Sequence, residues 1–414
     1  MSTPMGHPKP ARPASSETRG WAVSGPPAPG QGAPGSELPG PDGLAFYAPP
    51  APLPAGAAGQ VIWARPLTSA AALPGAAENL LILYHSRTLA GRDTAVSGTI
   101  SIPPGQPPDG GWPVLSWAHG TTGVADICAP SRDAPGHPSH IYNQLADVML
   151  NQWVNRGWAV VRTDYEGLGT PGRHPYLVGA SEARGTVDIV VAARQLRPGI
   201  GRRWAVMGHS QGGHAALFTA SLAPAWDCGL DLIGAVAIAP ADGLHDMITE
   251  LRGSRGPVTG LGFAILALLG AAAADPDVRL DQLLTRPAHH LLAIARTGGI
   301  DDLAVPGLHL PLVPAGLFRP GADLGPLLRI LAANDPAALR LGVPALIAQG
   351  SDDPIAAPCR TDRITRSLSA GGALLDYHVY PGKGHFDVIA AAHTQNAQWI
   401  DARLAEVVCP LQQA

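Results

Sequence analysis

The residues with the clearest chemical potential are Gly208-His209-Ser210-Gln211-Gly212, a Gly-x-Ser-x-Gly motif. An apolar run at 204–207 precedes the motif, and a run with helical spacing at 214–221 follows it. A strand that turns sharply into a helix lifts the central serine clear of the sheet, beside the positive end of the helix dipole, and needs small flanking residues. The motif therefore predicts a nucleophile at Ser210. The alternative is a glycine-rich turn with an N-cap serine.

A serine hydroxyl needs a base that removes its proton, and the base needs a carboxylate that fixes its tautomer. On a strand–turn–helix motif of this kind, the acid follows the serine in the chain. Residues 343–348 read as a buried strand, and the turn at 349–354 contains Asp352 and Asp353. We favour Asp353 as the acid, but the sequence leaves the choice between the two neighbours open.

The predicted base comes last in the chain. Residues 374–380 read as a strand, and His385 lies in the loop at 381–386 that follows it. The chain has 15 histidines, so the base must be identified by where each histidine lies relative to the predicted strands and helices. His378 and His393 lie inside a predicted strand and helix, while His209 and His214 stand too close to Ser210 in the chain to approach it from the required side.

Acyl transfer also needs N–H donors for the oxyanion of the tetrahedral intermediate. The amide of Gln211, the residue after the nucleophile, is one candidate. The second should come from the loop after the predicted strand at 113–118, which is His119-Gly120-Thr121-Thr122-Gly123. Gly120 would let the backbone approach a substrate, and Thr121 carries the candidate amide; a merely flexible turn is the alternative.

The elements that must position these residues follow a recognisable order. Apolar segments at 80–86 and 94–102 predict an antiparallel hairpin. Short apolar runs then alternate with helical segments, which predicts an α/β fold with a mainly parallel sheet and helices on both faces. Reactive side chains are expected in the loops beyond the carboxyl ends of such strands.

A long segment interrupts this alternation. Residues 242–341 separate the predicted strand at 232–239 from the one at 343–348, and they contain helical stretches at 260–274, 280–296 and 327–333. We predict a mostly helical cap inserted into a core formed by 44–241 and 342–414. The alternative is a structural subdomain that only covers the sheet.

Composition excludes some classes of protein. The 414 residues carry 28 Lys+Arg against 32 Asp+Glu, a net charge of −4, and 46% are hydrophobic. The charge disfavours a nucleic-acid partner, and the apolar content excludes a wholly disordered chain. Residues 1–43 are rich in Gly and Pro and predict a disordered leader without a signal peptide. The apolar run at 260–274 is too short for a membrane span, which needs roughly 20 residues.

Cysteine usage does not favour a metal site. Cys128, Cys228, Cys359 and Cys409 show no C-x-x-C spacing, so a zinc or redox centre has little support. Two disulfides and four reduced thiols are equally compatible with the sequence.

The chain resembles the secretory lipase family of α/β-hydrolases. The resemblance spans about residue 44 to the C-terminus, and the segments that carry it are Phe46-Tyr47-Ala48-Pro49-Pro50, 116–123, 164–172, 208–212, 349–353 and Gly384-His385.

This resemblance implies an esterase or lipase without metal or cofactor, a triad of Ser210, Asp353 and His385, and a small-molecule or lipid ester as substrate. It also implies pocket roles for Asp164 and Tyr165, beside His119 and Gly120, with packing as the alternative for the first two. Disulfides Cys128–Cys228 and Cys359–Cys409 follow by the same analogy. The family implies secretion, whereas the missing signal favours the cytoplasm; an acyltransferase and a non-catalytic hydrolase-fold binding protein remain alternative functions.

Overall fold

The computed structural model describes residues 38–226, 229–254, 260–304 and 314–408. Within these residues, nine strands form one sheet in the order β1-β2-β3-β5-β4-β6-β7-β8-β9. The strands are β1 (Val61–Pro66), β2 (Glu78–Arg87), β3 (Asp93–Ile102), β4 (Trp112–Ala118), β5 (Ala159–Thr163), β6 (Ile200–His209), β7 (Asp231–Ile238), β8 (Ala345–Gly350) and β9 (Leu375–Tyr380).

Helices alternate with the strands after β4. The α-helices are α1 (His140–Asn155), α2 (Gly179–Leu196), α3 (Gln211–Leu222), α4 (Leu244–Gly253), α5 (Leu261–Ala274), α6 (Leu280–Leu283), α7 (Arg286–Ala295), α8 (Ile300–Ala304), α9 (Gly325–Ala333), α10 (Pro358–Ala370) and α11 (Asp387–Val408). Short 3-10 helices are η1 (Gly43–Tyr47), η2 (Asp126–Cys128), η3 (Pro130–Arg132), η4 (Ala223–Ala225), η5 (Pro314–Gly316) and η6 (Pro336–Ala338).

Strand direction divides the sheet into two parts. β1, β2 and β3 pair antiparallel, and β3 also pairs antiparallel with β5. From β5 to β9 every neighbouring pair is parallel, as connections through helices require. The predicted hairpin and the predicted α/β-hydrolase fold are confirmed.

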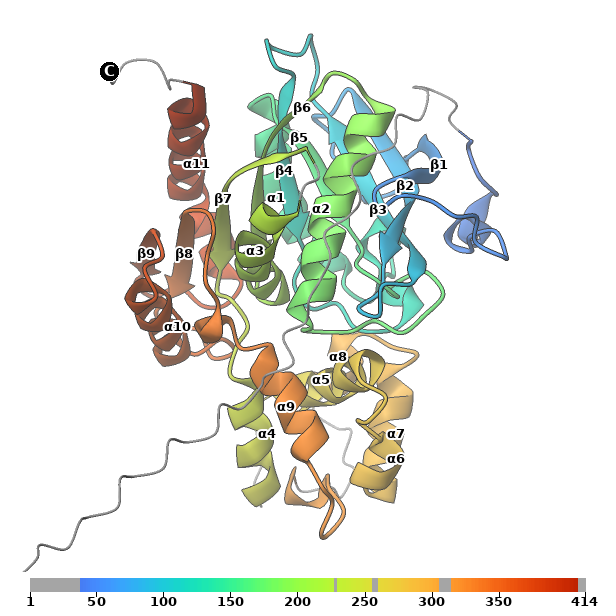
Figure 1. The fold of residues 1–414 in the computed structure, drawn as a ribbon, viewed down its shortest axis with the longest axis vertical. Coiled ribbons are helices and arrows are strands. Elements are labelled where there is room, and N and C mark those ends of the chain that lie inside the picture. The colour runs from blue at the N-terminus through green and yellow to red at the C-terminus, as the bar shows by residue number, and fades with distance from the viewer. Residues whose placement is uncertain (1–37, 227–228, 255–259, 305–313, 409–414) are drawn as a thin grey trace, which may run out of the picture.

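Alternate side chains of each strand are buried on opposite faces of the sheet. In β6, Val206 packs with α2 and α3, whereas its neighbour Met207 packs with α1 and α11. Val236 and Ala237 of β7 alternate in the same way. Successive side chains of a strand point to opposite faces, so continuous apolar runs produce a sheet covered on both sides (Figure 1).

Helices α4 to α9 lie between β7 and β8 in the chain and have an apolar cluster of their own (Figure 1). The stretch predicted to be helical at 280–296 is interrupted, which corrects the sequence reading. Leu284 forms a β-bridge with Phe318, and Thr285 donates to the Leu317 carbonyl, so α6 ends at Leu283. α7 then begins at Arg286, with a proline in its first turn.

Most of the predicted leader, residues 1–37, lies outside the described residues. The end of the 1–43 segment already contacts the fold, because Ala64 of β1 donates to the Leu38 carbonyl. No described helix combines the length and apolarity that crossing a bilayer would require.

Candidate active site

Ser210 occupies a sharp turn between β6 and α3. β6 ends at His209, α3 begins at Gln211, and Ser210 itself has φ +57°, a left-handed value that costs energy for a residue with a side chain. The neighbouring glycines permit this turn. A Cβ on Gly212 would overlap the Ala118 carbonyl, and one on Gly208 would overlap the Gly212 carbonyl.

The peptide groups on both sides of Ser210 are held by α3 and by the end of β7 with the residues that follow it. The Ser210 carbonyl accepts from the amides of His214 (3.0 Å) and Ala241 (2.9 Å), and the Ser210 amide donates to Ile238 (2.9 Å). A trans peptide is planar, so its N–H points opposite to its carbonyl. The Gln211 N–H therefore points away from these partners, and among the described residues it has no acceptor.

Asp353 and His385 meet at the carboxyl ends of β8 and β9. His385 Nδ1 donates to Asp353 Oδ2 at 2.7 Å, and both side chains are buried. Asp353 Oδ1 accepts from the amides of Ile355 and Ala356, each at 2.8 Å, so the carboxylate orientation is fixed. Asp352 is exposed and accepts from the Ser351 hydroxyl instead.

His385 is held beside the turn that carries Ser210. His209 Nε2 donates to the His385 carbonyl at 2.8 Å, and the two imidazole rings lie 4.5 Å apart. Burial and the nearby His385 hold the pKa of His209 well below its usual range, so His209 is neutral. Among the described residues Ser210 Oγ forms no hydrogen bond with His385, and such bonds often tighten only when substrate is bound.

The loop after β4 contacts His209, the residue before Ser210, and carries a second amide without an acceptor among the described residues. Gly120 N–H donates to the Tyr142 hydroxyl at 2.6 Å, and that hydroxyl lies 3.3 Å from His209 Nδ1. His119 Nδ1 donates to the Gly120 carbonyl at 2.7 Å. The Thr121 amide has no acceptor among the described residues, whereas the Thr121 hydroxyl contacts the Tyr176 hydroxyl at 2.7 Å.

The inserted helices are fastened to this loop. Ile300 N–H donates to the Thr122 carbonyl at 3.0 Å, and Gly123 forms a β-bridge with Gly299. The Cys128 thiol donates to the Gly298 carbonyl at 3.4 Å. Movement of the 298–300 segment would therefore also disturb the loop that carries Thr121.

Cys128 and Cys359 are free thiols. Cys228 and Cys409, their expected partners, lie outside the described residues. Each implied disulfide therefore has one cysteine outside the described residues. Burial raises the pKa of the Cys128 thiol to about 11, which keeps it protonated.

Asp164 and Tyr165 make packing and turn contacts. The Asp164 carboxylate accepts from the Ser97 hydroxyl at 2.6 Å and from the Ser131 amide at 2.9 Å. The Tyr165 hydroxyl donates to the His119 carbonyl at 3.1 Å, and its ring packs on the His119 ring. Their contacts match the packing alternative, and neither residue lines the large cavity between the inserted helices and the core.

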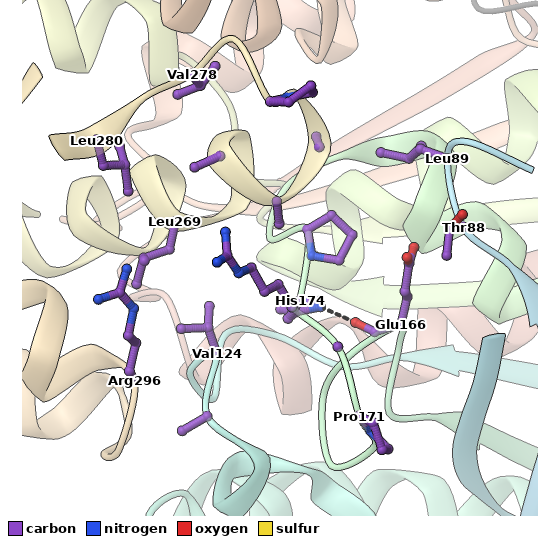
Figure 2. Close-up of a pocket in the computed structure, with 18 of the residues that line it drawn as sticks. Thr88, Leu89, Val124, Glu166, Pro171, His174, Leu269, Val278, Leu280 and Arg296 are labelled. Carbon is purple, nitrogen blue, oxygen red and sulfur yellow. Dashed lines mark hydrogen bonds between the residues drawn. The ribbon is translucent and has the colours of Figure 1, made fainter. Parts of the chain in front are cut away.

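Figure 2 shows residues that line this cavity. Its volume is about 1860 Å³. Apolar side chains such as Leu269, Leu280 and Val124 line it together with Arg296 and Glu166. His174 also lines the cavity, and its Nε2 lies 3.1 Å from Gln211 Nε2. The cavity is thus separated from the residue after Ser210 by a single side chain.

Glu182 and His214 form a second carboxylate–imidazole pair, which the sequence did not indicate as part of the site. Glu182 lies in α2 and His214 in α3, with Oε2 and Nδ1 2.6 Å apart. Glu182 stands in a segment that also contains Arg184 and Asp188, so the sequence offered no clear signal for it. Among the described residues, no group of three or more His, Cys, Asp or Glu side chains is arranged to hold a metal.

Comparison with known proteins finds lipases and esterases. The family model "Secretory lipase" matches residues 135–292. The predicted resemblance to the secretory lipases is confirmed. Lipase A of Moesziomyces aphidis is 26% identical over 249 residues, which cover 58% of this chain and about half (51%) of that lipase.

A second relative is named differently. A Mycobacterium tuberculosis protein named a probable inactive lipase is 24% identical over 382 residues, covering 87% of this chain and 81% of its own length. The family match supports ester hydrolysis as the class of activity. Because this relative is named as inactive, a shared fold does not by itself establish catalysis.

Solved structures share the fold. Candida antarctica lipase A in its closed state has a TM-score of 0.71 at 20% identity, covering 84% of this chain and 83% of that one. The rice cell wall degrading esterase LipA from Xanthomonas oryzae has a TM-score of 0.65 at 20% identity, covering 84% of this chain and 100% of that one. These likenesses show that the chain has an α/β-hydrolase fold.

Proposed function

We propose that the chain is a serine ester hydrolase that works through an acyl-enzyme. Ser210 attacks the ester carbonyl while His385 accepts its proton and Asp353 holds the His385 tautomer. The observation that carries this proposal is the hydrogen bond from His385 Nδ1 to Asp353, because it presents the other ring nitrogen as an acceptor next to the Ser210 turn.

The unpartnered amides of Gln211 and Thr121 are proposed to bind the oxyanion. Each such donor contributes about 2.7–4 kcal/mol to transition-state stabilisation. His385 then returns its proton to the departing alcohol, and water, activated by the same imidazole, hydrolyses the acyl-enzyme.

Residues 242–341 are proposed to act as a cap, and the cavity beneath it is proposed to receive one side of the ester. Its volume exceeds the roughly 300–1,000 Å³ typical of small-ligand sites, which favours a bulky substrate. Leu269 and Leu280 can contact an acyl chain, whereas Arg296 and Glu166 favour a substrate that also carries polar groups.

A fluorophosphonate probe and p-nitrophenyl esters test the chemistry together. We expect the probe to label Ser210, and Ser210→Ala to abolish labelling and turnover without changing the far-UV spectrum. Ser369→Ala, at an exposed serine of α10, is the matched control and should keep both. An unlabelled wild-type protein, or an active Ser210→Ala variant, would refute the proposal in favour of a non-catalytic hydrolase-fold protein.

The cavity assignment has a separate test. Leu269→Trp should fill the cavity and reduce kcat/KM for palmitate esters much more than for acetate esters. Leu374→Trp, at an exposed position before β9, should change neither rate. Product analysis with a competing alcohol distinguishes hydrolysis from acyl transfer by the same residues.

A further inference from the structure

The buried pair of Glu182 and His214 lies directly behind the Ser210 turn and has no part in the proposed proton transfers. Glu182 is fully buried and His214 is 1% exposed on its side chain. Burying a carboxylate and an imidazole costs free energy unless every polar atom is satisfied. The contacts of the pair show what it holds.

Both nitrogens of His214 face acceptors. Nδ1 lies 2.6 Å from Glu182 Oε2, and Nε2 lies 3.0 Å from the backbone carbonyl of Asn334. A neutral imidazole has one N–H, so two donated bonds to an ionised carboxylate and a carbonyl require an imidazolium. Burial by itself lowers the pKa of His214, but the Glu182 charge and the two hydrogen bonds outweigh it and raise that pKa overall.

The second oxygen of Glu182 holds Gln211. Gln211 Nε2 donates to Glu182 Oε1 at 3.0 Å and to His174 Nε2 at 3.1 Å. His174 can accept because its Nδ1 donates to the Glu166 carbonyl, and burial lowers the pKa of His174 to about 4. The side chain of the proposed oxyanion residue is therefore fixed from behind by two acceptors.

The pair also joins the end of the inserted helices to the core. Asn334 directly follows α9, and its Oδ1 accepts from the amide of Gly179, the first residue of α2. Asp335, the next carboxylate near His214, is paired with Arg363 at 2.8 Å and contributes a smaller attraction. Helices α2 and α3 and the end of α9 thus meet at His214.

We infer that Glu182 and His214 are positioning residues: as a buried carboxylate–imidazolium pair they hold Gln211, whose backbone amide binds the oxyanion, and they fasten the inserted helices to the nucleophile helix. This inference rests on the proposed function, because the amide of Gln211 matters only if an oxyanion forms. It assigns no proton transfer to either residue.

Two substitutions at Glu182 separate hydrogen bonding from charge. Glu182→Leu removes both acceptors, and we expect kcat for a p-nitrophenyl ester to fall roughly 10- to 100-fold with little change in KM. Glu182→Gln can still accept from Gln211 and donate to a neutral His214, whose remaining N–H reaches Asn334. We expect this variant to recover most of the lost kcat.

The pH profile tests the imidazolium. Loss of the His214 proton at alkaline pH should lower kcat of the wild-type protein, and this alkaline decrease should disappear in Glu182→Gln, where His214 is already neutral. Asp188→Asn removes another buried carboxyl from α2 and is the matched control. It should retain both the wild-type kcat and its alkaline decrease.

A measurement without substrate completes the test. In a His385→Gln background, a strongly downfield imidazole N–H proton resonance should remain and should vanish on Glu182→Gln. Wild-type kcat in a folded Glu182→Leu variant, or absence of this resonance, would overturn the inference while leaving the proposed function intact. A wild-type protein that neither hydrolyses esters nor labels at Ser210 would instead overturn the proposed function, and the positioning role with it.

Discussion

Two buried carboxylate–imidazole pairs lie on different sides of Ser210, and they differ in what the second ring nitrogen faces. The oxygen–nitrogen distances are nearly equal, 2.7 Å for Asp353–His385 and 2.6 Å for Glu182–His214. His214 Nε2 faces the Asn334 carbonyl, whereas His385 Nε2 has no hydrogen-bond partner among the described residues. The free nitrogen, and not the strength of the pair, identifies the group that can accept a proton.

The elements that carry the pairs explain this difference. Asp353 and His385 lie in loops after parallel strands, where side chains from several segments can converge on open space. Glu182 and His214 lie inside helices that pack on each other and on the sheet, so every nitrogen meets a protein atom. A carboxylate and an imidazole can therefore take part in a reaction at Asp353–His385, whereas at Glu182–His214 they hold packed helices together.

Replacing each histidine with glutamine should show the largest difference in activity between the two pairs. His385→Gln removes the base, and we expect kcat/KM to fall about 10⁴-fold or more. His214→Gln should lose only roughly 10- to 100-fold, because it disturbs an oxyanion donor without removing the base. Equal losses, measured with one p-nitrophenyl ester at one pH, would contradict the distinction.

The next largest difference in kcat is expected between substitutions of the neighbouring aspartates, Asp352 and Asp353. Asp353→Asn leaves a side chain that no longer stabilises the imidazolium and can hold the wrong tautomer, so kcat should fall by about 10³- to 10⁴-fold. Asp352→Asn alters an exposed carboxylate and should leave kcat close to the wild-type value. The reverse order would exchange the roles of the two residues.

Gly212→Ala tests the turn that lies between the pairs. The new Cβ would overlap the Ala118 carbonyl, so the backbone must shift and the free energy of unfolding should fall by about 2 kcal/mol or more. Gly253→Ala at the end of α4 is the control, because outside its own helix no atom of the described residues lies within 4 Å of a new Cβ. Urea denaturation of both variants measures the difference.

The smallest expected effect concerns a buried carboxyl without an imidazole partner. Asp188 accepts from the Ser86 hydroxyl, and burial raises its pKa to about 7. A pKa raised above the unfolded value near 4 means that stability is lost as pH rises from about 4 to 7. Asp188→Asn should abolish this loss, so between pH 5 and pH 8 the wild-type protein should lose about 2 kcal/mol more than the variant in urea unfolding.

Much of the site followed from the order of residues along the chain. The motif at 208–212 and the histidine after the last strand could be found because each follows a segment that the sequence predicts to be a strand. The choice of Asp353 over Asp352 could not be made in this way, since neighbouring turn residues point in different directions until the backbone is known. The partners of Cys128 could not be found either, because a hydrogen bond to Gly298 depends on the packing of the inserted helices.

The sequence by itself determined the alternation of strands and helices and the chain order of nucleophile, acid and base, because local hydrophobic patterns and small residues act over short distances. Tertiary structure alone decided which polar atoms are left without partners. Gln211 and His214 share α3, but Glu182 lies in α2 and Asn334 follows α9, so only packing brings acceptors to both nitrogens of His214. Among the described residues, the amides of Thr121 and Gln211 have no acceptor. Whether a polar atom finds a hydrogen-bond partner depends on how the whole molecule packs. Here that difference separates the groups that are free to react from the groups that hold them in place.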